Sequence, residues 1–535
     1  MAGSEPSILQ QLAQYRLGRA LYSSTGVSSK LSSTGIVNLL IFSSLFYLAW
    51  ALIQALCRYQ RVSHIPGPWL SKISGLNLVV RDVCLQRNET ILEWHKKYGP
   101  IVCIAPNAVS VASLSATREI YGSTGKFSKS SYFDHFKGYN ARSVFATLPH
   151  QEHQAKRRHT SQFYQASNIY GRPEVEDLTR DRLSAVLRHV ECKGPNPSVD
   201  VYSLTDWYGF DIITRLILGP RHCTNAIEED SQERGILRGL KHLQFWGPLH
   251  INLPGVFQIL VSLLSWIPSL DYLQAEDELA VWSYDKVKRA IEDPLFDRDD
   301  CLLRRLVAQC GGLDTKEARA KKSFEQNFIA AEVLDNINAA EATLSVTATY
   351  LLYHLSFRPQ WQEKVREELS NLPVQADGFP SFSHINETPI LEACMKEVYR
   401  LHPASSGRSE RVVPSGGRKF SGVYVPEETV VTTSITALHQ TEDVFPAPDQ
   451  FLPERWLQDQ TAGQESHLIP FGYGARICLG KPLATLEIKV LIAGIFLRYR
   501  TRLSDSFDHE IMKQCSTHDA VPSGLRCPLV FEKLQ

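Results

Sequence analysis

A single cysteine in a glycine-punctuated loop is the feature of this sequence that most constrains its fold and chemistry. The string Phe-Gly-Tyr-Gly-Ala-Arg-Ile-Cys-Leu-Gly runs from Phe471 to Gly480 and contains Cys478. Backbone N–H groups, a following helix N-terminus and a bound metal all favour the thiolate form of such a cysteine. A helix is expected over Leu479–Tyr499, because a lysine-proline pair stands near its start and apolar residues follow at helical spacing. The loop therefore predicts one thiolate ligand for a metal, whereas the other ten cysteines are interpreted as small apolar residues.

The same string resembles the haem-binding loop of the cytochrome P450 family, F-x-x-G-x-R-x-C-x-G, and fills each of its fixed positions. The resemblance extends from His64 to about the C-terminus. It implies a mainly α fold with a smaller β portion, the cytochrome P450 fold, preceded by an N-terminal transmembrane helix. It also implies haem b (iron protoporphyrin IX) as cofactor, with Cys478 as the axial iron ligand. Within the loop, it assigns haem contacts to Phe471, Arg476 and Gly480, the Arg476 guanidinium pairing with a propionate.

Composition favours a globular fold and gives no sign of nucleic-acid binding. The chain has 535 residues, 43% hydrophobic and 21% charged, which suits a sizeable core. Lysine plus arginine and aspartate plus glutamate both total 57, so the formal net charge is zero, and no basic run is present. The cysteines are scattered without a Cys-x-x-Cys pair, which fits reduced thiols better than a disulfide framework.

The N-terminal region contains a stretch that is long enough to cross a membrane. The 27 residues between Lys30 and Arg58 carry no charge, and about 20 apolar residues suffice for a span. A cleaved signal peptide is disfavoured because the apolar region starts late and is long, and a buried globular helix is the other alternative. The resemblance implies a single-pass anchor in the endoplasmic reticulum membrane, with the catalytic domain in the cytosol. The expected organisation is a short N-terminal segment (1–33), a transmembrane anchor (34–57), a proline-rich hinge (58–70) and a catalytic domain (71–535).

Three further side chains are candidate contacts for the haem propionates. His153 and Arg157 are four residues apart in a basic segment, so they share one face of a helix. Taken alone, this segment reads as a solvated basic face. The resemblance assigns both side chains to the propionates, and it implies a third contact from a strand at Arg411, with Arg408 as the alternative.

One long helix is expected over Ser323–Ser356, which contains neither glycine nor proline and would span about 50 Å. Its middle, Asn338–Thr343, carries small side chains that form either a packing face or a surface for something flat. The resemblance assigns Thr343 to proton delivery during dioxygen activation. The position of the family's acid is occupied by Ala342. Glu341 lies roughly 100° away around the helix, so it is not expected to replace that acid.

Glu397, Arg400 and Arg455 are candidate members of a structural ion network. Glu397 and Arg400 stand three apart on one helix face, which on its own is a common surface pair. Arg455 belongs to the string Phe-Leu-Pro-Glu-Arg-Trp further on. The two strings resemble the family's E-x-x-R and P-E-R-F elements, which together brace the haem-side core. If the network is buried, removing one member leaves an uncompensated charge.

Short strands are expected on either side of a long helical region. Ile101–Pro106 and Val109–Val111 read as a β-hairpin, and Val423–Pro426 with Thr429–Thr433 read as a small β-meander. Substrate specificity is expected to depend on two loops, near Ser130–Val144 and Phe245–Leu263.

These features predict a haem-thiolate monooxygenase that inserts one oxygen atom of O2 into a small lipophilic substrate. The sequence shows no flavin- or dinucleotide-binding region of a reductase. Electrons are therefore expected from NADPH through NADPH–cytochrome P450 reductase, with cytochrome b5 as a second donor. The resemblance to filamentous-fungal members favours secondary-metabolite biosynthesis. Two alternatives to a monooxygenase remain. The first is a haem-thiolate isomerase or dehydratase that needs no external electrons, and Ala342 at the position of the family's acid favours it. The second is a non-catalytic haem sensor or carrier.

Overall fold

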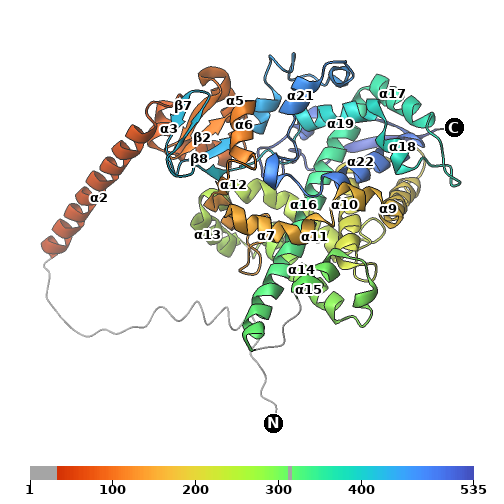
Figure 1. The fold of residues 1–535 in the computed structure, drawn as a ribbon, viewed down its shortest axis with the longest axis horizontal. Helices are drawn as coiled ribbons and strands as arrows, with labels where there is room; N and C mark the ends of the chain where they lie inside the picture. Colours follow the sequence, from red (N-terminus) through yellow and green to blue (C-terminus); the bar gives the residue numbers. More distant parts are fainter. Residues whose placement is uncertain (1–32, 265, 311–315, 535) are drawn as a thin grey trace, which may run out of the picture. The chain divides into compact units, whose positions relative to one another are not determined.

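The computed structural model describes residues 33–264, 266–310 and 316–534 and is mainly helical, with a smaller β portion (Figure 1). The predicted fold class is therefore confirmed. The chain divides into two units, Met1–Cys57 and Arg58–Gln535. Apart from Ser33, the expected N-terminal segment 1–33 lies outside the described residues.

The described part of the first unit is a single apolar helix. It belongs to α2 (Ser33–Val62), which has no acidic residue in its first turn and a basic one, Arg61, in its last. Ile41–Val62 is long and apolar enough to cross a membrane, the one such helix in the described part of the chain. Its large apolar side chains are exposed, Phe42 at 71% and Phe46 at 76%. The limits 34–57 for a membrane anchor remain a prediction, and the helix continues into the stretch expected to form the hinge.

The second unit is a helical body with small sheets at its edges (Figure 1). The long helix predicted from the absence of glycine and proline is α16, and the helix predicted after the cysteine loop is α22. The helices that follow α2 are α3 (Trp69–Ile73), α4 (Leu76–Val83), α5 (Arg87–Tyr98), α6 (Leu114–Tyr121), α7 (His150–Ser161), α8 (Ala166–Tyr170), α9 (Pro173–Glu191), α10 (Val201–Leu218), α11 (Gln232–Leu243), α12 (Gly247–Asn252), α13 (Pro254–Leu264), α14 (Ala275–Glu292), α15 (Leu302–Cys310), α16 (Lys316–Phe357), α17 (Pro359–Ser370), α18 (Phe382–Asn386), α19 (Pro389–Leu401), α20 (Ile435–His439), α21 (Ala462–His467) and α22 (Lys481–Phe496).

Helix α16 is the axis around which the other helices pack. It contacts α10 along much of its length and also α14, α15, α19 and α22 (Figure 1). Its C-terminal half is buried, with Val346, Ala348 and Leu351 inaccessible to solvent. Near the middle, however, Asn338 and Ala339 are exposed. The core therefore leaves the small-residue segment of this helix free of packing partners on one side.

In the described part of the chain, ten short strands form three sheets. The predicted hairpin is present, since β1 and β2 pair antiparallel. The predicted meander is wrong: β8 is separated from β7 and lies in the five-stranded sheet, parallel to β2 and antiparallel to β5. Three successive residues of β8 are buried, so its backbone N–H and C=O groups need protein partners on both edges of the strand. The distant strands β2 and β5 provide these partners. The strands are β1 (Ile101–Ala105), β2 (Ala108–Val111), β3 (Ser128–Lys129), β4 (Ser198–Asp200), β5 (Arg411–Val412), β6 (Arg418–Phe420), β7 (Val423–Val425), β8 (Val430–Thr433), β9 (Tyr499–Arg502) and β10 (Pro528–Lys533).

Candidate active site

The cysteine loop is held in a tight conformation just before α22. The Cys478 N–H donates to the carbonyl of Phe471 at 2.9 Å, which closes the loop on itself. Gly474 has a φ of +70°, and a Cβ at this position would lie 2.1 Å from the backbone oxygen of Tyr121. A side chain there would collide with backbone, so glycine is required for the close approach. Gly480 is the N-cap residue of α22.

The Cys478 sulfur is crowded by protein but accessible to solvent. Burial raises the pKa of the thiol, whereas the N–H groups of Gly480 and Lys481 and the guanidinium of Arg157 lower it. The two N–H donors and the charge of Arg157 all favour the thiolate, the N–H groups as expected at a helix N-terminus. The Cys478 thiol is therefore protonated in the absence of a metal. Once a metal cation binds the sulfur, the surrounding N–H groups and the Arg157 charge stabilise the thiolate.

Two cations lie opposite each other on neighbouring strands. Lys129 on β3 and Arg411 on β5 are a direct cross-strand pair, and both side chains are 6% exposed. Like charges at directly opposed positions repel, which destabilises a sheet. The Lys129 ammonium donates to the carbonyl of Phe145 and lies over the ring of Phe133, 3.7 Å from its centroid. Burial, followed by the charges of Arg411 and Arg476, holds the pKa of Lys129 well below its ordinary value.

The predicted residues on α7 and in the cysteine loop face the same region. Arg476 donates to the carbonyls of Thr147 and Leu148, each at 2.8 Å, and its Nε has no partner. Burial and the neighbouring Arg411 and Arg157 lower the pKa of Arg476 to about 9. Burial, followed by Arg476 and Lys129, lowers the pKa of His153 to about 2, so its imidazole is neutral at physiological pH.

Arg157 links α7 to the cysteine loop, because its guanidinium donates to the carbonyl of Ile477 at 2.7 Å. Arg408, the alternative to Arg411, lies elsewhere. It pairs with Asp82 and donates to the side-chain oxygen of Asn252 at 2.8 Å. Arg411 is therefore the residue of the two that joins the cationic cluster.

This cationic cluster, Lys129, Arg411, Arg476 and Arg157, fits a dianionic group. Among the described residues, no carboxylate lies within ion-pairing distance of any of the four. The Arg476 Nε and the buried His153 Nδ1 also lack hydrogen-bond partners. Buried cations without counter-charges are costly to maintain. The two propionates of haem would neutralise them, with Cys478 as the ligand to the iron.

Removing one of these cations should have opposite effects on the free and the haem-loaded protein. In the Lys129→Met variant we expect haem to bind roughly tenfold to a hundredfold more weakly, because a charge-assisted hydrogen bond is worth about 1.5–3 kcal/mol. The haem-free protein should unfold at an equal or higher denaturant concentration, since the repulsion from Arg411 is relieved. Haem titration and urea unfolding of the same preparation measure both quantities. Lys419→Met, an exposed lysine on β6, is the control and should change neither; equal haem affinity in the two variants would contradict the assignment.

The middle of α16 provides the opposite side of the candidate site. The Thr343 hydroxyl donates to the carbonyl of Ala339 at 2.8 Å and retains its lone pairs as acceptors. Ala342, which occupies the family's acid position, is only partly buried. Glu341 is 4% exposed and faces Asp206 on α10. Burial, followed by the Asp206 carboxylate, raises the pKa of Glu341 well above its ordinary value. Glu341 therefore does not accompany Thr343 on its face of the helix.

A buried tyrosine that no sequence motif marks lies beside α16. The Tyr164 hydroxyl donates to the side-chain oxygen of Asn336 on α16 at 2.8 Å. Its pKa is raised by burial and, among other charges, by Cys478. Tyr164 thus contacts α16 and lies within electrostatic range of Cys478.

The residues Glu397, Arg400 and Arg455 come together in one buried network. The two carboxylate oxygens of Glu397 accept from Arg400 at 2.7 and 3.0 Å, and one accepts from Arg455 at 3.2 Å. The indole N–H of Trp456 and the backbone N–H of Leu452 donate to the same carboxylate at 2.8 and 3.0 Å. Because Glu397 is inaccessible to solvent and Arg400 is 1% exposed, every lone pair and N–H here needs a partner within the protein.

Comparison with known proteins identifies the family. The cytochrome P450 family profile matches residues 66–519. The chain is 37% identical over 510 residues to cytochrome P450 monooxygenase FGM1 of Gibberella zeae, covering 94% of this chain and 99% of the relative. It is 26% identical to cytochrome P450 monooxygenase pkfB of Emericella nidulans, covering 88% and 92%, and 26% identical to cytochrome P450 monooxygenase BOT1 of Botryotinia fuckeliana, covering 85% and 88%.

The chain therefore belongs to the cytochrome P450 family. The predicted family and enzyme class are confirmed. This family uses a haem-thiolate cofactor and a redox partner, and the cysteine loop and the cationic cluster fit the first of these. The roles assigned to the individual side chains stay predictions.

Proposed function

We propose that this cytochrome P450 is a haem-thiolate monooxygenase that oxidises a small lipophilic substrate with electrons from NADPH, passed on by NADPH–cytochrome P450 reductase. The observation that carries the proposal is the Cys478 thiol, supported by two backbone N–H donors and the charge of Arg157 and accompanied by a cationic cluster without counter-charges among the described residues. The named relatives are monooxygenases as well. Cytochrome b5 is a second candidate donor.

In the proposed reaction, one oxygen atom enters a C–H bond of the substrate and the other leaves as water. NADPH supplies the two electrons and becomes NADP⁺, and one further proton comes from solvent. The haem, when bound, supplies dioxygen activation, and thiolate donation favours O–O cleavage. The chain's own contribution is to hold the sulfur in its loop, to pair Arg411, Arg476 and Lys129 with the propionates, and to place the Thr343 hydroxyl for proton transfer.

Oxygen consumption tests the reaction type. A ligand is first identified by its shift of the haem absorption spectrum, and O2 uptake is then followed with reductase and NADPH. We expect uptake and an oxygenated product. A ligand that shifts the spectrum but is rearranged without O2 or NADPH would instead support an isomerase or dehydratase. This is the hypothesis favoured by Ala342, which occupies the position of the family's acid.

The proposed substrate class is a fungal secondary metabolite, supported by the fungal origin of the relatives. Metabolite profiles of a producing strain with and without the gene test this. A lipophilic precursor should accumulate in the deletion strain and lack one oxygen relative to the lost product. An unchanged profile under conditions of confirmed expression would contradict the proposal.

Thr343→Ala should lower product formation by roughly two orders of magnitude, because a positioned proton donor contributes about 10²–10⁴-fold to a rate. No carboxyl group lies at position 342 to compensate. NADPH consumption should fall much less, so the yield of product per NADPH drops. The measurement is product and NADPH in one assay. Thr343→Ser keeps the hydroxyl and should retain most of the yield; equal losses in both variants would point to packing rather than proton transfer.

We also infer that the catalytic unit touches a membrane through a surface of its own, here called the apolar patch: Trp69, Leu76, Ile259, Leu263 and Trp266. All five side chains are more than 60% exposed. They come from α3, α4, α13 and the turn after α13. Helix α12 connects them, because it contacts both α4 and α13. Aromatic and aliphatic side chains gathered on one exposed surface are typical of a membrane contact.

Deleting residues 1–57 should therefore leave much of the protein on membranes. In that truncated protein, Ile259→Glu with Leu263→Glu should move the partition toward the soluble fraction at least about tenfold, since burying one such side chain is worth about 1.5–3 kcal/mol. Flotation with lipid vesicles measures this. Val281→Glu, an exposed position on α14 outside the patch, is the control. A truncated protein that is fully soluble before any substitution would contradict the second contact.

A further inference from the structure

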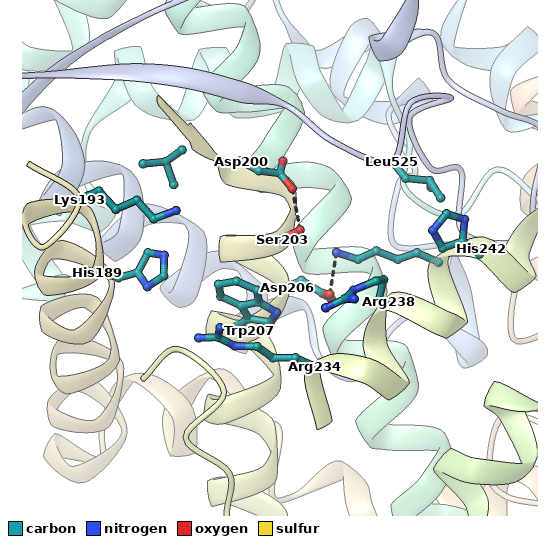
Figure 2. A pocket seen from close by; sticks show the side chains of 12 residues that line it. His189, Lys193, Asp200, Ser203, Asp206, Trp207, Arg234, Arg238, His242 and Leu525 are labelled. Carbon is teal, nitrogen blue, oxygen red and sulfur yellow. Dashed lines mark hydrogen bonds and ion pairs between the residues drawn. The ribbon is translucent and has the colours of Figure 1, made fainter. Parts of the chain in front are cut away.

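A cavity of about 210 Å³ lies between α9, α10 and α11, in a part of the molecule that the proposed reaction does not use. Figure 2 shows Lys193 and His189 entering from one side and Arg234, Arg238 and His242 from the other, with Ser203 and Trp207 between them. The volume is sufficient for several waters or for one small polyatomic ion. The cavity is thus a concave site whose charged groups converge on one space.

The lining of this cavity is electropositive. Four basic side chains, those of Lys193, Arg234, Arg238 and Lys241, face two carboxylates in this lining, so about two positive charges are left over. Burial is the main cause that lowers the pKa of both His189 and His242, which makes them neutral N–H donors at physiological pH.

The two carboxylates are already engaged. Asp200 accepts from the hydroxyl of Ser203 at 2.6 Å and from the backbone N–H of Cys527 at 2.7 Å. Asp206 lies on the floor of the cavity, with its Oδ2 atom 2.7 Å from the Lys241 ammonium. Asp200 is thus satisfied by neutral donors, and Asp206 is paired with Lys241 through Oδ2, while its Oδ1 has no hydrogen-bond partner.

Two of the remaining cations, Lys193 and Arg238, lack anionic partners among the described residues. The side chains of Lys193 and Arg238 make no ion pair and no hydrogen bond with any described residue. Arg234 is fixed in place: it donates to the carbonyls of Ala226 and Ile227 and lies over the Trp207 ring, 3.8 Å from its centroid. Its one ion pair in the described part of the chain is a long one, 3.9 Å to the exposed carboxylate of Asp230. A guanidinium held by neutral carbonyls and an aromatic face is pre-positioned, and Arg is the side chain best suited to phosphate oxygens.

We propose that this cavity binds a small dianion of the phosphate type, either free phosphate or the phosphate group of a soluble monoester, through Lys193, Arg234 and Arg238. Arg234 supplies the rigid contact, while Lys193 and Arg238 close over the ligand from opposite sides. The imidazole of His242 can add a neutral hydrogen bond.

The floor of the cavity gives such a ligand a path to the helix that carries Thr343. Lys241 is 8% exposed and Asp206 is 1% exposed, and Glu341 of α16 lies directly behind this pair. An anion that attracts Lys241 weakens its hold on Asp206, and Asp206 is the carboxylate next to Glu341. Glu341 is two residues before Thr343 on the same helix. The proposed site is therefore in contact with α16 while remaining separate from the haem side.

Calorimetric titration of the full-length, haem-loaded protein with inorganic phosphate tests this proposal. The reference titration uses sodium chloride at equal ionic strength, because general screening would also respond to salt. We expect saturable phosphate binding that the double variant Lys193→Gln with Arg238→Gln weakens at least about tenfold. The matched control, Arg188→Gln with Lys288→Gln, removes two exposed cations of α9 and α14 that do not line the cavity, and it should bind like the unmodified protein.

The haem content of each variant, measured first, shows that the fold is intact. A parallel titration with glycerol 3-phosphate separates the two sources of the dianion: tighter binding than phosphate supports a monoester, and equal or weaker binding supports free phosphate. No saturable binding to the unmodified protein, or equal binding by both double variants, would overturn the proposal.

Discussion

Replacing Glu397 by alanine should reduce the free energy of unfolding by about 3–5 kcal/mol, a large share of a domain's typical stability. The substitution leaves two buried guanidinium groups without their common carboxylate. Arg400 is 1% exposed and Arg455 is 4% exposed, so water cannot replace the lost acceptor. The Trp456 indole N–H and the Leu452 backbone N–H lose the same acceptor. We therefore expect little soluble, haem-loaded protein at 37 °C.

Urea unfolding of the loaded protein at low temperature measures the loss. The control is Glu465→Gln, which removes a carboxylate that pairs with Lys396 at 2.8 Å on the surface. Both of these side chains are partly exposed, and such pairs contribute at most about 1 kcal/mol. If the Glu397 variant were no less stable than the Glu465 variant, the network would not have the structural role assigned to it.

Replacing Cys478 by serine should abolish product formation while leaving the fold intact. Serine keeps the shape of the loop and its hydrogen bond to Phe471, but an alcohol is not ionised by the donors that support a thiolate. Haem held only by its propionate contacts should be retained poorly and lack thiolate ligation. Product formation, haem per protein and the circular dichroism spectrum report on these three points.

Cys192→Ser is the matched control, because Cys192 is an exposed thiol at the C-terminal end of α9. It should behave like the unmodified protein in all three measurements. Retained activity in the Cys478 variant would remove the basis of the proposed reaction.

Features that depend on neighbouring residues could be predicted from the sequence. The loop around Cys478, the helix after it and the long helix through Thr343 follow from glycine spacing, helix signals and the absence of helix breakers. The position of Glu341 also follows from helix geometry, since one residue of offset directs it toward α10. In each case the signal lies within a few turns of the chain, although the partners, such as Asp206 for Glu341, do not.

Features that depend on distant pairing could not be predicted in this way. Lys129 joins the cationic cluster because β3 pairs with β5, across nearly three hundred residues, and nothing in its local sequence marks it. The same pairing separates Arg411 from Arg408, which are three residues apart but have different partners. The wrongly predicted meander has the same origin, because β8 takes its partners from β2 and β5 rather than from the adjacent β7.

The central claim is that Cys478 holds haem iron as a thiolate. The absorption spectrum of the purified, reduced protein under carbon monoxide tests it most directly, because the position of the band depends on the axial ligand. We predict the band characteristic of thiolate ligation in the unmodified protein and its loss in the Cys478→Ser variant. A haem-loaded protein that shows only the band of a neutral axial ligand, or a band unchanged by the substitution, would contradict the account.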